Sequence, residues 1–340
     1  MNGNNETIIS VKNLKTYFYT NQRCNKAVNG VSLNIEKGRT LCIVGESGCG
    51  KSVTASSIMQ LLPRLSRIEE GEIIYHSGDK RGDIRIDSLE RNGKEMRSLR
   101  GKDIAMIFQD PMTALNPVYT IGWQIEEMIR SHEKVTKKEA RERTLELLNE
   151  MGIPNPQKRI DQYPHEFSGG MRQRVMIAMA VSCNPKVLIA DEPTTALDVT
   201  IQAQIFELLN RLKKEYHTSV MLITHDMGVV CELADDVAVM YMGNIIESGT
   251  AMEVLDSPMH PYTRALMKSI PILGRGRKQK INPIRGATPD PFHRPEGCQF
   301  APRCDFACEE CKKKMPEETM LEGTHMVRCS RYQEVVDSGK

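Results

Sequence analysis

Short alternating runs of hydrophobic and polar residues dominate the first part of the chain. They fill Ile8–Glu36 without any long helical stripe, a pattern that predicts β-strands. Further strands are expected at Gly71–Tyr75 and Asp83–Leu89, while the polar stretch 76–97 is expected to form surface hairpin and loop. Together these segments predict an antiparallel sheet beside the main core.

The pattern then changes to helix between about residues 111 and 182. After a short apolar strand at Ile104–Phe108, apolar residues recur at helical spacing in 121–131 and 137–151. A third helix is expected from Ser168 to Val181, ended by Asn184-Pro185. This helical block interrupts a chain that otherwise alternates strand and helix.

Strand–helix alternation resumes with Val187–Ala190, a continuous apolar run typical of a strand buried on both faces of a parallel sheet. An amphipathic helix at 201–215, a strand at 219–224 and a closing hairpin at 237–248 follow. The basic segment 275–280 is expected to be a solvated linker. No internal repeat is present, so the sequence predicts one α/β unit with added sheet and helical parts.

Composition excludes several classes of protein. The net charge of +2 over 340 residues is too balanced to indicate nucleic-acid binding. No apolar run approaches the roughly 18–20 residues that cross a bilayer, and residues 1–7 lack the apolar segment of a signal peptide. We therefore expect a cytosolic protein whose membrane association depends on a partner.

The segment Gly45–Ser52 reads G-x-x-x-x-G-K-S, between an apolar run at 41–44 and a helix expected at 53–62. Glycines let such a loop turn its N–H groups inward, and the helix N-terminus adds partial positive charge. The segment thus predicts a phosphate-binding loop, in which Lys51 faces the outer phosphates and Ser52 offers a hydroxyl to Mg²⁺. The alternative is a glycine-rich turn that binds nothing.

Cys49 lies inside this loop, close to the helix N-terminus and to Lys51. Both features lower the pKa of a thiol. We therefore expect a reactive thiol whose modification inactivates the site and which bound nucleotide protects.

Two carboxylates, Asp191 and Glu192, end the buried strand at 187–190. The carboxyl ends of parallel strands are where α/β folds bind ligands. Asp191 can then hold Mg²⁺ opposite Ser52, and Glu192 can orient or deprotonate an attacking water. Without the phosphate loop, an acidic pair that only caps a strand would be an equally good interpretation.

A second candidate anion site lies at Ser168, Gly169 and Gly170, where the third helix begins with free N–H groups. Ser-Gly-Gly is a good helix start in any protein. Two anion sites with a single phosphate loop nevertheless indicate a nucleotide held between two chains.

The motifs, and the order in which they follow one another along the chain, resemble those of the ATP-binding cassette (ABC) ATPases. The resemblance covers residues from about 8 to 250 and implies a P-loop RecA-like core with an antiparallel β subdomain and an inserted helical subdomain. Phe167 and Met171 replace the more usual Leu and Gln of the signature. The matching elements are the phosphate loop Gly45–Ser52, Q-loop Gln109, signature Ser168–Gly170, Walker B Val187–Glu192, D-loop Ala196–Asp198 and switch His225.

The resemblance implies a role for each matching residue. Glu192 corresponds to the catalytic base, His225 to the γ-phosphate sensor, and Gln109 to the link with a membrane subunit. Phe18 fits best as the aromatic that stacks on adenine, with Tyr17 and Tyr19 as rivals. The implied Mg²⁺ ligands are Ser52, Gln109 and Asp191. The implied ATP contacts are Gly45, Glu46, Ser47, Gly48, Cys49, Gly50, Lys51, Ser52, Val53 and Phe18, with Ser168, Gly169, Gly170 and Asp198 acting on ATP of the opposing subunit.

A nearly full-length resemblance narrows the family to the ATP-binding subunits of dipeptide/oligopeptide permeases. It rests on the Gly-Glu-Ser-Gly start of the phosphate loop and on a Cys-containing tail at 297–304. The other segments that carry it are 109–117, 167–174 and 260–263.

Five of the ten cysteines crowd the last tenth or so of the chain, which indicates a separate C-terminal module. Four match tail cysteines of this subfamily, some of whose members carry an iron–sulfur cluster. Four thiolates suit a [4Fe–4S] cluster or structural Zn²⁺, and free thiols are the remaining alternative. Cys308 is interpreted as a spare thiol that could replace Cys311. The candidate ligands are Cys298, Cys304, Cys311 and Cys329.

The resemblance thus implies an ATPase that energises import of di- or oligopeptides from the cytoplasmic face of the membrane. Its implied partners are a second ABC ATPase subunit (a heterodimer, or else a homodimer), two transmembrane permease subunits and an extracytoplasmic substrate-binding protein, with no nucleic acid. The expected domains are 1–250, with a helical subdomain at about 111–182, and a C-terminal extension at 251–340.

Three alternatives stay open from the sequence. The same machinery could import nickel or glutathione, because the ATPase need not touch the cargo. An ABC ATPase of DNA repair or translation typically shows a long coiled coil or duplicated cassettes, and neither pattern occurs here. A metal-binding regulator is disfavoured by the intact Glu192 and His225.

Overall fold

The computed structural model describes residues 6–20, 23–195, 197–269 and 284–338. They form two compact units. Unit 1 consists of residues 1–8, 35–39 and 88–223, and unit 2 of residues 9–34, 40–87 and 224–340, apart from the positions outside these described ranges. Ala196 of the D-loop and the expected linker 275–280 lie outside the described residues.

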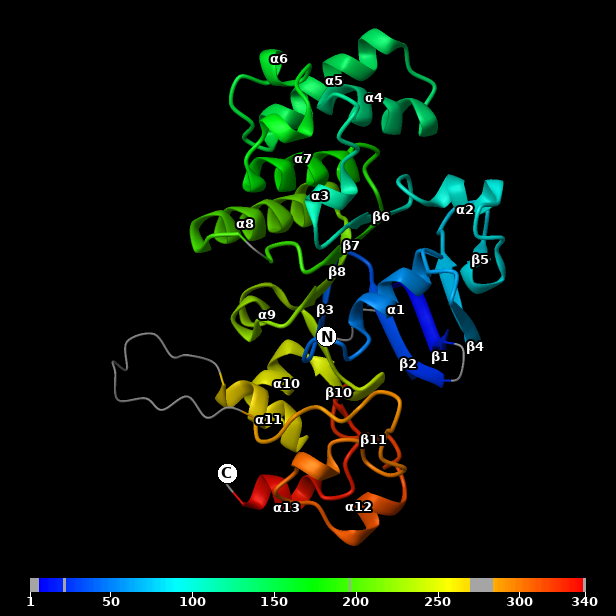
Figure 1. The fold of residues 1–340 in the computed structure, drawn as a ribbon, viewed down its shortest axis with the longest axis vertical. Helices are drawn as coiled ribbons and strands as arrows, with labels where there is room; N and C mark the ends of the chain where they lie inside the picture. The colour runs from blue at the N-terminus through cyan, green and yellow to red at the C-terminus, as the bar shows by residue number, and fades with distance from the viewer. Residues whose placement is uncertain (1–5, 21–22, 196, 270–283, 339–340) are drawn as a thin grey trace. The chain divides into compact units, whose positions relative to one another are not determined.

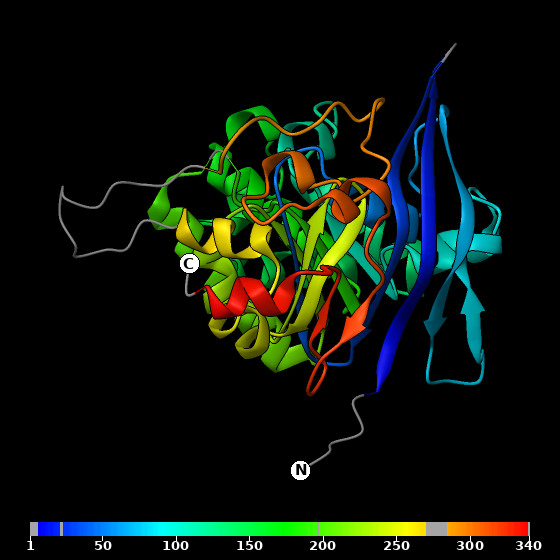
Figure 2. The same ribbon diagram turned by 90° about the horizontal axis from the view of Figure 1, so that it is seen from below.

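Unit 2 contains the predicted antiparallel sheet, which runs in the order β2-β1-β4-β5. The long strands lie side by side in Figure 2. One sequence expectation is wrong here: the segment 83–89 is a strand only at its start and continues as a 3-10 turn at Ile86–Ser88. Asp87 causes the change, since its carboxylate accepts the Ile73 N–H at 2.8 Å. The strands are β1 (Thr7–Thr20), β2 (Arg23–Glu36), β4 (Ser66–His76) and β5 (Asp83–Arg85).

A second set of strands in unit 2 carries the phosphate loop. Strand β3 (Thr40–Val44) is buried along its whole length and pairs in parallel with β9 (Asp236–Tyr241). Strand β10 (Asn244–Thr250) forms the predicted hairpin with β9. The loop follows β3 and leads into α1 (Lys51–Ile58), which is shorter than the helix expected at 53–62.

The C-terminal segment of unit 2 continues this sheet. Strand β12 (Met326–Val327) pairs antiparallel with β10, and β11 (Thr319–Met320) pairs with β12. Glu247 on β10 is fully buried and accepts hydrogen bonds from the Met259 and His260 amides and from the His325 ring. The helices of this part are α9 (Met227–Leu233), α10 (Ala251–Asp256), α11 (Pro261–Lys268), α12 (Glu309–Lys313) and α13 (Tyr332–Asp337).

His260 begins α11 as its N-cap, with Nδ1 accepting the Tyr262 N–H at 3.0 Å. Burial lowers the pKa of His260 to about 4, against the opposing effect of the Glu247 charge. The ring is therefore neutral at pH 7 and keeps the lone pair that this cap requires.

Unit 1 combines a parallel sheet with the predicted helical block. Strands β6 (Ile104–Ile107), β7 (Val187–Asp191) and β8 (Ser219–Thr224) pair in parallel in that order. Strands β7 and β8 are buried throughout, and for β7 the continuous apolar run predicted this. Helices α4, α5 and α6 lie together in the upper part of Figure 1. The helices are α2 (Lys94–Leu99), α3 (Pro111–Ala114), α4 (Ile121–His132), α5 (Lys137–Glu150), α6 (Pro156–Arg159), α7 (Gly169–Val181) and α8 (Val199–Tyr216).

Within the described part of the chain, no helix is both long enough and apolar enough to cross a membrane.

Candidate functional site

The phosphate loop of unit 2 requires glycine at two crowded positions. A Cβ on Gly45 would lie 2.1 Å from the Met240 carbonyl oxygen, and one on Gly50 would lie 2.3 Å from that of Ala27. Both residues have positive φ, of 155° and 109°. Only glycine combines this backbone with such close approach, so the loop conformation is built into the sequence.

Lys51 and Ser52 begin helix α1 and differ in exposure. Lys51 is 4% exposed, and its ammonium donates to the Gly45 carbonyl at 2.7 Å and to the Glu46 carbonyl at 3.2 Å. Ser52 is exposed at the first turn of the helix. The buried cation is thus held inside a loop that ends at a helix N-terminus, a combination that favours phosphate.

Cys49 corrects one sequence expectation. The side chain points inward, where its Sγ packs beneath Gly45, and the residue is only 4% exposed. Burial raises the pKa of the Cys49 thiol and outweighs the nearby charge of Lys51. The prediction that this thiol has a lowered pKa is therefore wrong.

Glu46 connects the phosphate loop to residues that sequence reasoning did not assign to the site. Its carboxylate accepts hydrogen bonds from Arg303 and, at 3.1 Å, from Thr288. Its backbone N–H donates to the Tyr262 hydroxyl at 2.8 Å. The only sequence signal for these contacts was the location of Tyr262 and Arg303 in the subfamily segments 260–263 and 297–304.

The candidate catalytic carboxylates lie in unit 1, at the end of β7. Asp191 is 6% exposed. Glu192 has a left-handed backbone, with φ 44°, and its carboxylate accepts hydrogen bonds from Gln109 Nε2 at 3.0 Å and Thr195 Oγ1 at 3.1 Å. Residues other than glycine rarely adopt this backbone, and such strain is typical of functional positions. The structure thus brings together Glu192 and Gln109, which are 83 positions apart.

Two further predicted residues are N-caps of exposed helix starts in unit 1. Ser168 caps α7 by accepting the Met171 N–H, and Ser168 and Gly169 are exposed. Asp198 caps α8 by accepting the Ile201 N–H at 3.0 Å and is exposed beside Val199, which is 80% exposed. Both helix starts are accessible to another molecule. His225, in unit 2, is likewise exposed, just after β8.

The three aromatic candidates for adenine stacking lie near the end of β1. The Tyr17 hydroxyl donates to Asn29 at 2.8 Å, and the Tyr19 hydroxyl pairs with Glu69. Phe18 is half-buried and points to the opposite face of the strand, because side chains alternate. Phe18 remains the prediction for this contact.

The C-terminal cysteines converge on one small cavity in unit 2, of about 10 Å³. Burial raises the pKa of Cys304 to about 11 and that of Cys329 to about 12, and it also raises the pKa of Cys298. Cys308 is not among the lining residues, although its Sγ lies 3.5 Å from that of Cys311. Among the residues that the structure describes, no three His, Cys, Asp or Glu side chains are arranged as a metal site. The cysteines that line the cavity are Cys298, Cys304, Cys311 and Cys329.

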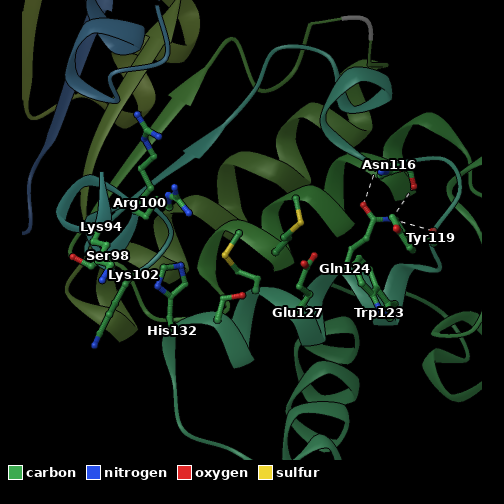
Figure 3. Close-up of a pocket in the computed structure, with 14 residues that line it drawn as sticks. Lys94, Ser98, Arg100, Lys102, Asn116, Tyr119, Trp123, Gln124, Glu127 and His132 are labelled. Carbon is green, nitrogen blue, oxygen red and sulfur yellow. Dashed lines mark hydrogen bonds between the residues drawn. The ribbon is translucent and has the colours of Figure 1, made fainter. Parts of the chain in front are cut away.

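Unit 1 also contains a large pocket, of about 880 Å³, shown in Figure 3. On one side Tyr119 and Trp123 stack with ring centroids 3.9 Å apart, and each is 41% exposed. Gln124 fixes the adjoining loop by donating to the Asn116 and Tyr119 carbonyls, which are among the dashed contacts in the figure. The basic residues around it are Lys94, Arg97, Arg100 and Lys102. The pocket therefore combines an aromatic platform with a positively charged rim.

Comparison with known proteins agrees with these features. Residues 28–195 match the family described as ABC transporter, and residues 246–311 match the oligopeptide/dipeptide transporter C-terminal region. The chain is 50% identical to the dipeptide transport ATP-binding protein DppD of Bacillus subtilis, over 95% of this chain and 94% of that protein. It is 48% identical to the oligopeptide transport ATP-binding protein AppD of the same species, over 96% and 98%.

Solved structures support the same fold. The dimeric post-hydrolysis structure of the ATP-binding cassette MJ0796, bound to ADP and Pi, has a TM-score of 0.63 and 27% identity, and the match covers 72% of this chain and 98% of that one. The match covers nearly all of that cassette but not the whole of this chain. The chain is an ATPase and belongs to the ABC ATPases of dipeptide/oligopeptide transporters.

Proposed function

We propose that this chain hydrolyses ATP to energise the import of di- or oligopeptides through a membrane permease, from the cytoplasmic face of the membrane. The observation that carries the proposal is about 50% identity, over nearly the whole chain, to ATP-binding proteins named for dipeptide and oligopeptide transport. The match of residues 246–311 to the C-terminal region of such transporters supports it independently of the cassette. Nickel or glutathione is the alternative cargo.

The phosphate loop is the proposed binding site of ATP. The amides of Gly45–Ser52 and the ammonium of Lys51 bind the β- and γ-phosphates, where both helix N-terminus and cation favour negative charge. In unit 1, Glu192 orients and deprotonates the water that attacks the γ-phosphate, with Gln109 holding its carboxylate. His225 contacts the γ-phosphate, and Phe18 stacks on adenine.

The oxygen ligands available for Mg²⁺ suit that ion, which prefers carboxylate and hydroxyl oxygens. Asp191 supplies a buried carboxylate at the end of β7, Ser52 a hydroxyl at the first turn of α1, and Gln109 a side-chain amide oxygen. When bound, Mg²⁺ neutralises charge on the phosphates.

The exposed starts of α7 and α8 are proposed to act on a second ATPase subunit. Ser168 and Gly169 are exposed and Gly170 is half-buried, so the start of α7 is the proposed contact with ATP on the opposing subunit. Asp198 and the exposed Val199 lie at the same interface. A related, non-identical subunit is the proposed partner, with a second copy of this chain as the alternative.

We further propose that residues 1–250 act as the cassette, with residues 111–182 as its helical subdomain, and that 251–340 act as an extension. An extracytoplasmic substrate-binding protein acts through the permease subunits.

The aromatic and basic pocket of unit 1 is the proposed contact with a cytoplasmic segment of a permease subunit. Large exposed aromatics anchor protein interfaces well, because they bury much area for little loss of side-chain freedom. The pocket lies between α2 and α4, and Asn116, two positions after the end of α3, is one of its lining residues. Movement of a bound permease segment would thus reach Gln109, which contacts Glu192, along the chain segment 109–116.

Trp123→Ala tests both this contact and the proposed transporter role. Loss of an interface anchor typically costs about 2 kcal/mol or more, so we expect the affinity for permease subunits in detergent-solubilised membranes to fall roughly 30-fold. Binding of ATP to the isolated chain should not change. The matched control is Tyr216→Ala, an exposed aromatic on α8. Equal recovery of permease subunits with both variants would contradict the docking site, and recovery of no membrane protein with the unmodified chain would contradict the transporter role.

The cysteine-lined cavity is the proposed site of a metal centre, with a [4Fe–4S] cluster as the first choice. Four thiols of the C-terminal segment line one cavity, and four thiolates are the ligands that such a cluster uses. Structural Zn²⁺ is the alternative, and the small volume of the cavity suits the smaller ion. Either metal group would cross-link and stabilise the C-terminal segment, which otherwise contains little regular secondary structure.

Anaerobic purification decides between these groups. We expect about four iron and about four sulfide per chain with broad visible absorbance, and loss of both in Cys304→Ser. The control is Cys308→Ser, which removes the cysteine outside the cavity and should keep the iron. Zinc in place of iron supports the alternative ligand, whereas neither metal at stoichiometric amounts refutes the metal centre.

A further inference from the structure

Glu46 is an unfavourable residue for a phosphate loop unless its charge is offset. A carboxylate beside the phosphates of ATP repels them, and Glu46 is only 27% exposed at its side chain, so water screens it weakly. We propose that Arg303, in the C-terminal segment, is a positioning residue for ATP binding: it neutralises Glu46 and holds it in the orientation that keeps the phosphate loop open to ATP.

The contact between the two residues is a two-pronged ion pair. Arg303 Nη1 donates to Glu46 Oε2 at 2.6 Å, and Nη2 donates to Oε1 at 3.0 Å. Such forked pairs fix orientation as well as charge. The Arg303 side chain is 4% exposed, which makes the pair largely shielded from solvent. Burial alone would raise the pKa of Glu46, but the hydrogen bond and charge of Arg303 hold it below its usual value.

Arg303 is itself held rigidly, so its position can determine that of Glu46. Its Nε donates to the Arg285 carbonyl at 2.9 Å, and its Nη1 lies 3.3 Å from the Tyr241 hydroxyl. The guanidinium also lies over the Tyr241 and Phe300 rings, at 5.9 and 5.8 Å from their centroids. A side chain locked in this way loses little freedom when it binds a carboxylate.

The backbone of Glu46 transmits this position to the phosphate-binding groups. Its N–H donates to the Tyr262 hydroxyl at 2.8 Å, and its carbonyl accepts from the Lys51 ammonium at 3.2 Å. A rotation of Glu46 would therefore move a contact of the lysine that faces the phosphates. Tyr262 and Arg303 both belong to the segment after residue 250, so this segment contacts the phosphate loop directly at Glu46.

Arg303 could serve folding alone or ATP binding, and the two roles predict different results. A double-mutant cycle with Glu46 distinguishes them. We expect Arg303→Ala to raise the Kd and KM for MgATP about ten-fold or more, with kcat changed much less, because the variant leaves the Glu46 charge unpaired beside the phosphates. In a Glu46→Gln background the same change should raise Kd less than about two-fold, because no unpaired carboxylate is left. Arg303→Lys should recover part of the affinity.

The matched control is Arg285→Ala, which removes an 85% exposed arginine side chain of the same segment and should leave Kd unchanged. Circular dichroism and the metal content of each preparation report folding and the cysteine site separately, so this test does not depend on which metal binds there. If Arg303→Ala lowers ATP affinity equally with and without the Glu46→Gln change, the proposal is overturned. A fall in kcat at unchanged Kd would overturn it as well. If Arg303→Ala does not fold, Arg303→Lys provides the same comparison in both backgrounds.

Discussion

Replacing Glu192 by glutamine should reduce ATP turnover by roughly 100- to 10,000-fold while ATP still binds. Glutamine keeps the size of the side chain and an oxygen that can accept from Gln109 and Thr195, but it cannot take a proton from the attacking water. The phosphate loop is untouched by the change. We therefore expect ATP-bound chains to accumulate as a closed dimer with the partner subunit.

Steady-state ATPase activity and size-exclusion chromatography with ATP measure the two parts of this prediction. Glu207→Gln, at an exposed glutamate on α8, is the matched control and should behave as the unmodified chain. Turnover in the Glu192 variant close to that of the control would contradict its role as the base.

Glu247→Ala should lower the free energy of unfolding by about 3–5 kcal/mol, which corresponds to a fall in Tm of roughly 5 °C for a chain of this length. The carboxylate is fully buried and accepts from Met259 N at 2.6 Å, His260 N at 2.9 Å and His325 Nε2 at 2.8 Å. Alanine leaves these three donors buried without their acceptor. The loss would loosen the start of α11 and with it Tyr262, which contacts the phosphate loop.

Thermal unfolding monitored by circular dichroism measures this effect. Glu309→Ala removes an exposed ion pair with Lys312 and should shift Tm by less than about 2 °C, because exposed pairs contribute little. A Glu247 variant as stable as this control would show that the buried carboxylate does not anchor the C-terminal segment.

Local sequence patterns predicted the elements whose environment is uniform along their length. The run Val187–Ala190 is apolar throughout because β7 is buried on both faces, and the helix expected from Ser168 begins there because Ser168 caps it. The same reasoning failed at Asp83–Leu89. There, the Asp87 side chain takes the place of a ladder contact and turns the chain, which no alternation of residues reveals.

Some features of the candidate site were likewise predicted from the sequence, and others were not. The motifs predicted Glu192 and Gln109, and the structure brings them together. They did not predict the contact of Glu46 with Arg303, which joins residues 257 positions apart and depends on the fold. Nor did they predict the burial of Cys49, because the orientation of a side chain within a turn is set by what packs against it. Motif spacing identifies chemistry that lies in one segment, whereas contacts between distant segments need the structure.

Transport by the assembled complex is the direct measurement of the proposed peptide import. The chain would be purified from membranes with the permease subunits bound to it, reconstituted in liposomes with the extracytoplasmic binding protein, and supplied with MgATP. The measurement is uptake of a labelled peptide series against labelled nickel and glutathione, with the Glu192→Gln chain as the inactive control. We predict ATP-dependent uptake of di- or oligopeptides only. Uptake of nickel or glutathione without peptide uptake would contradict the assignment.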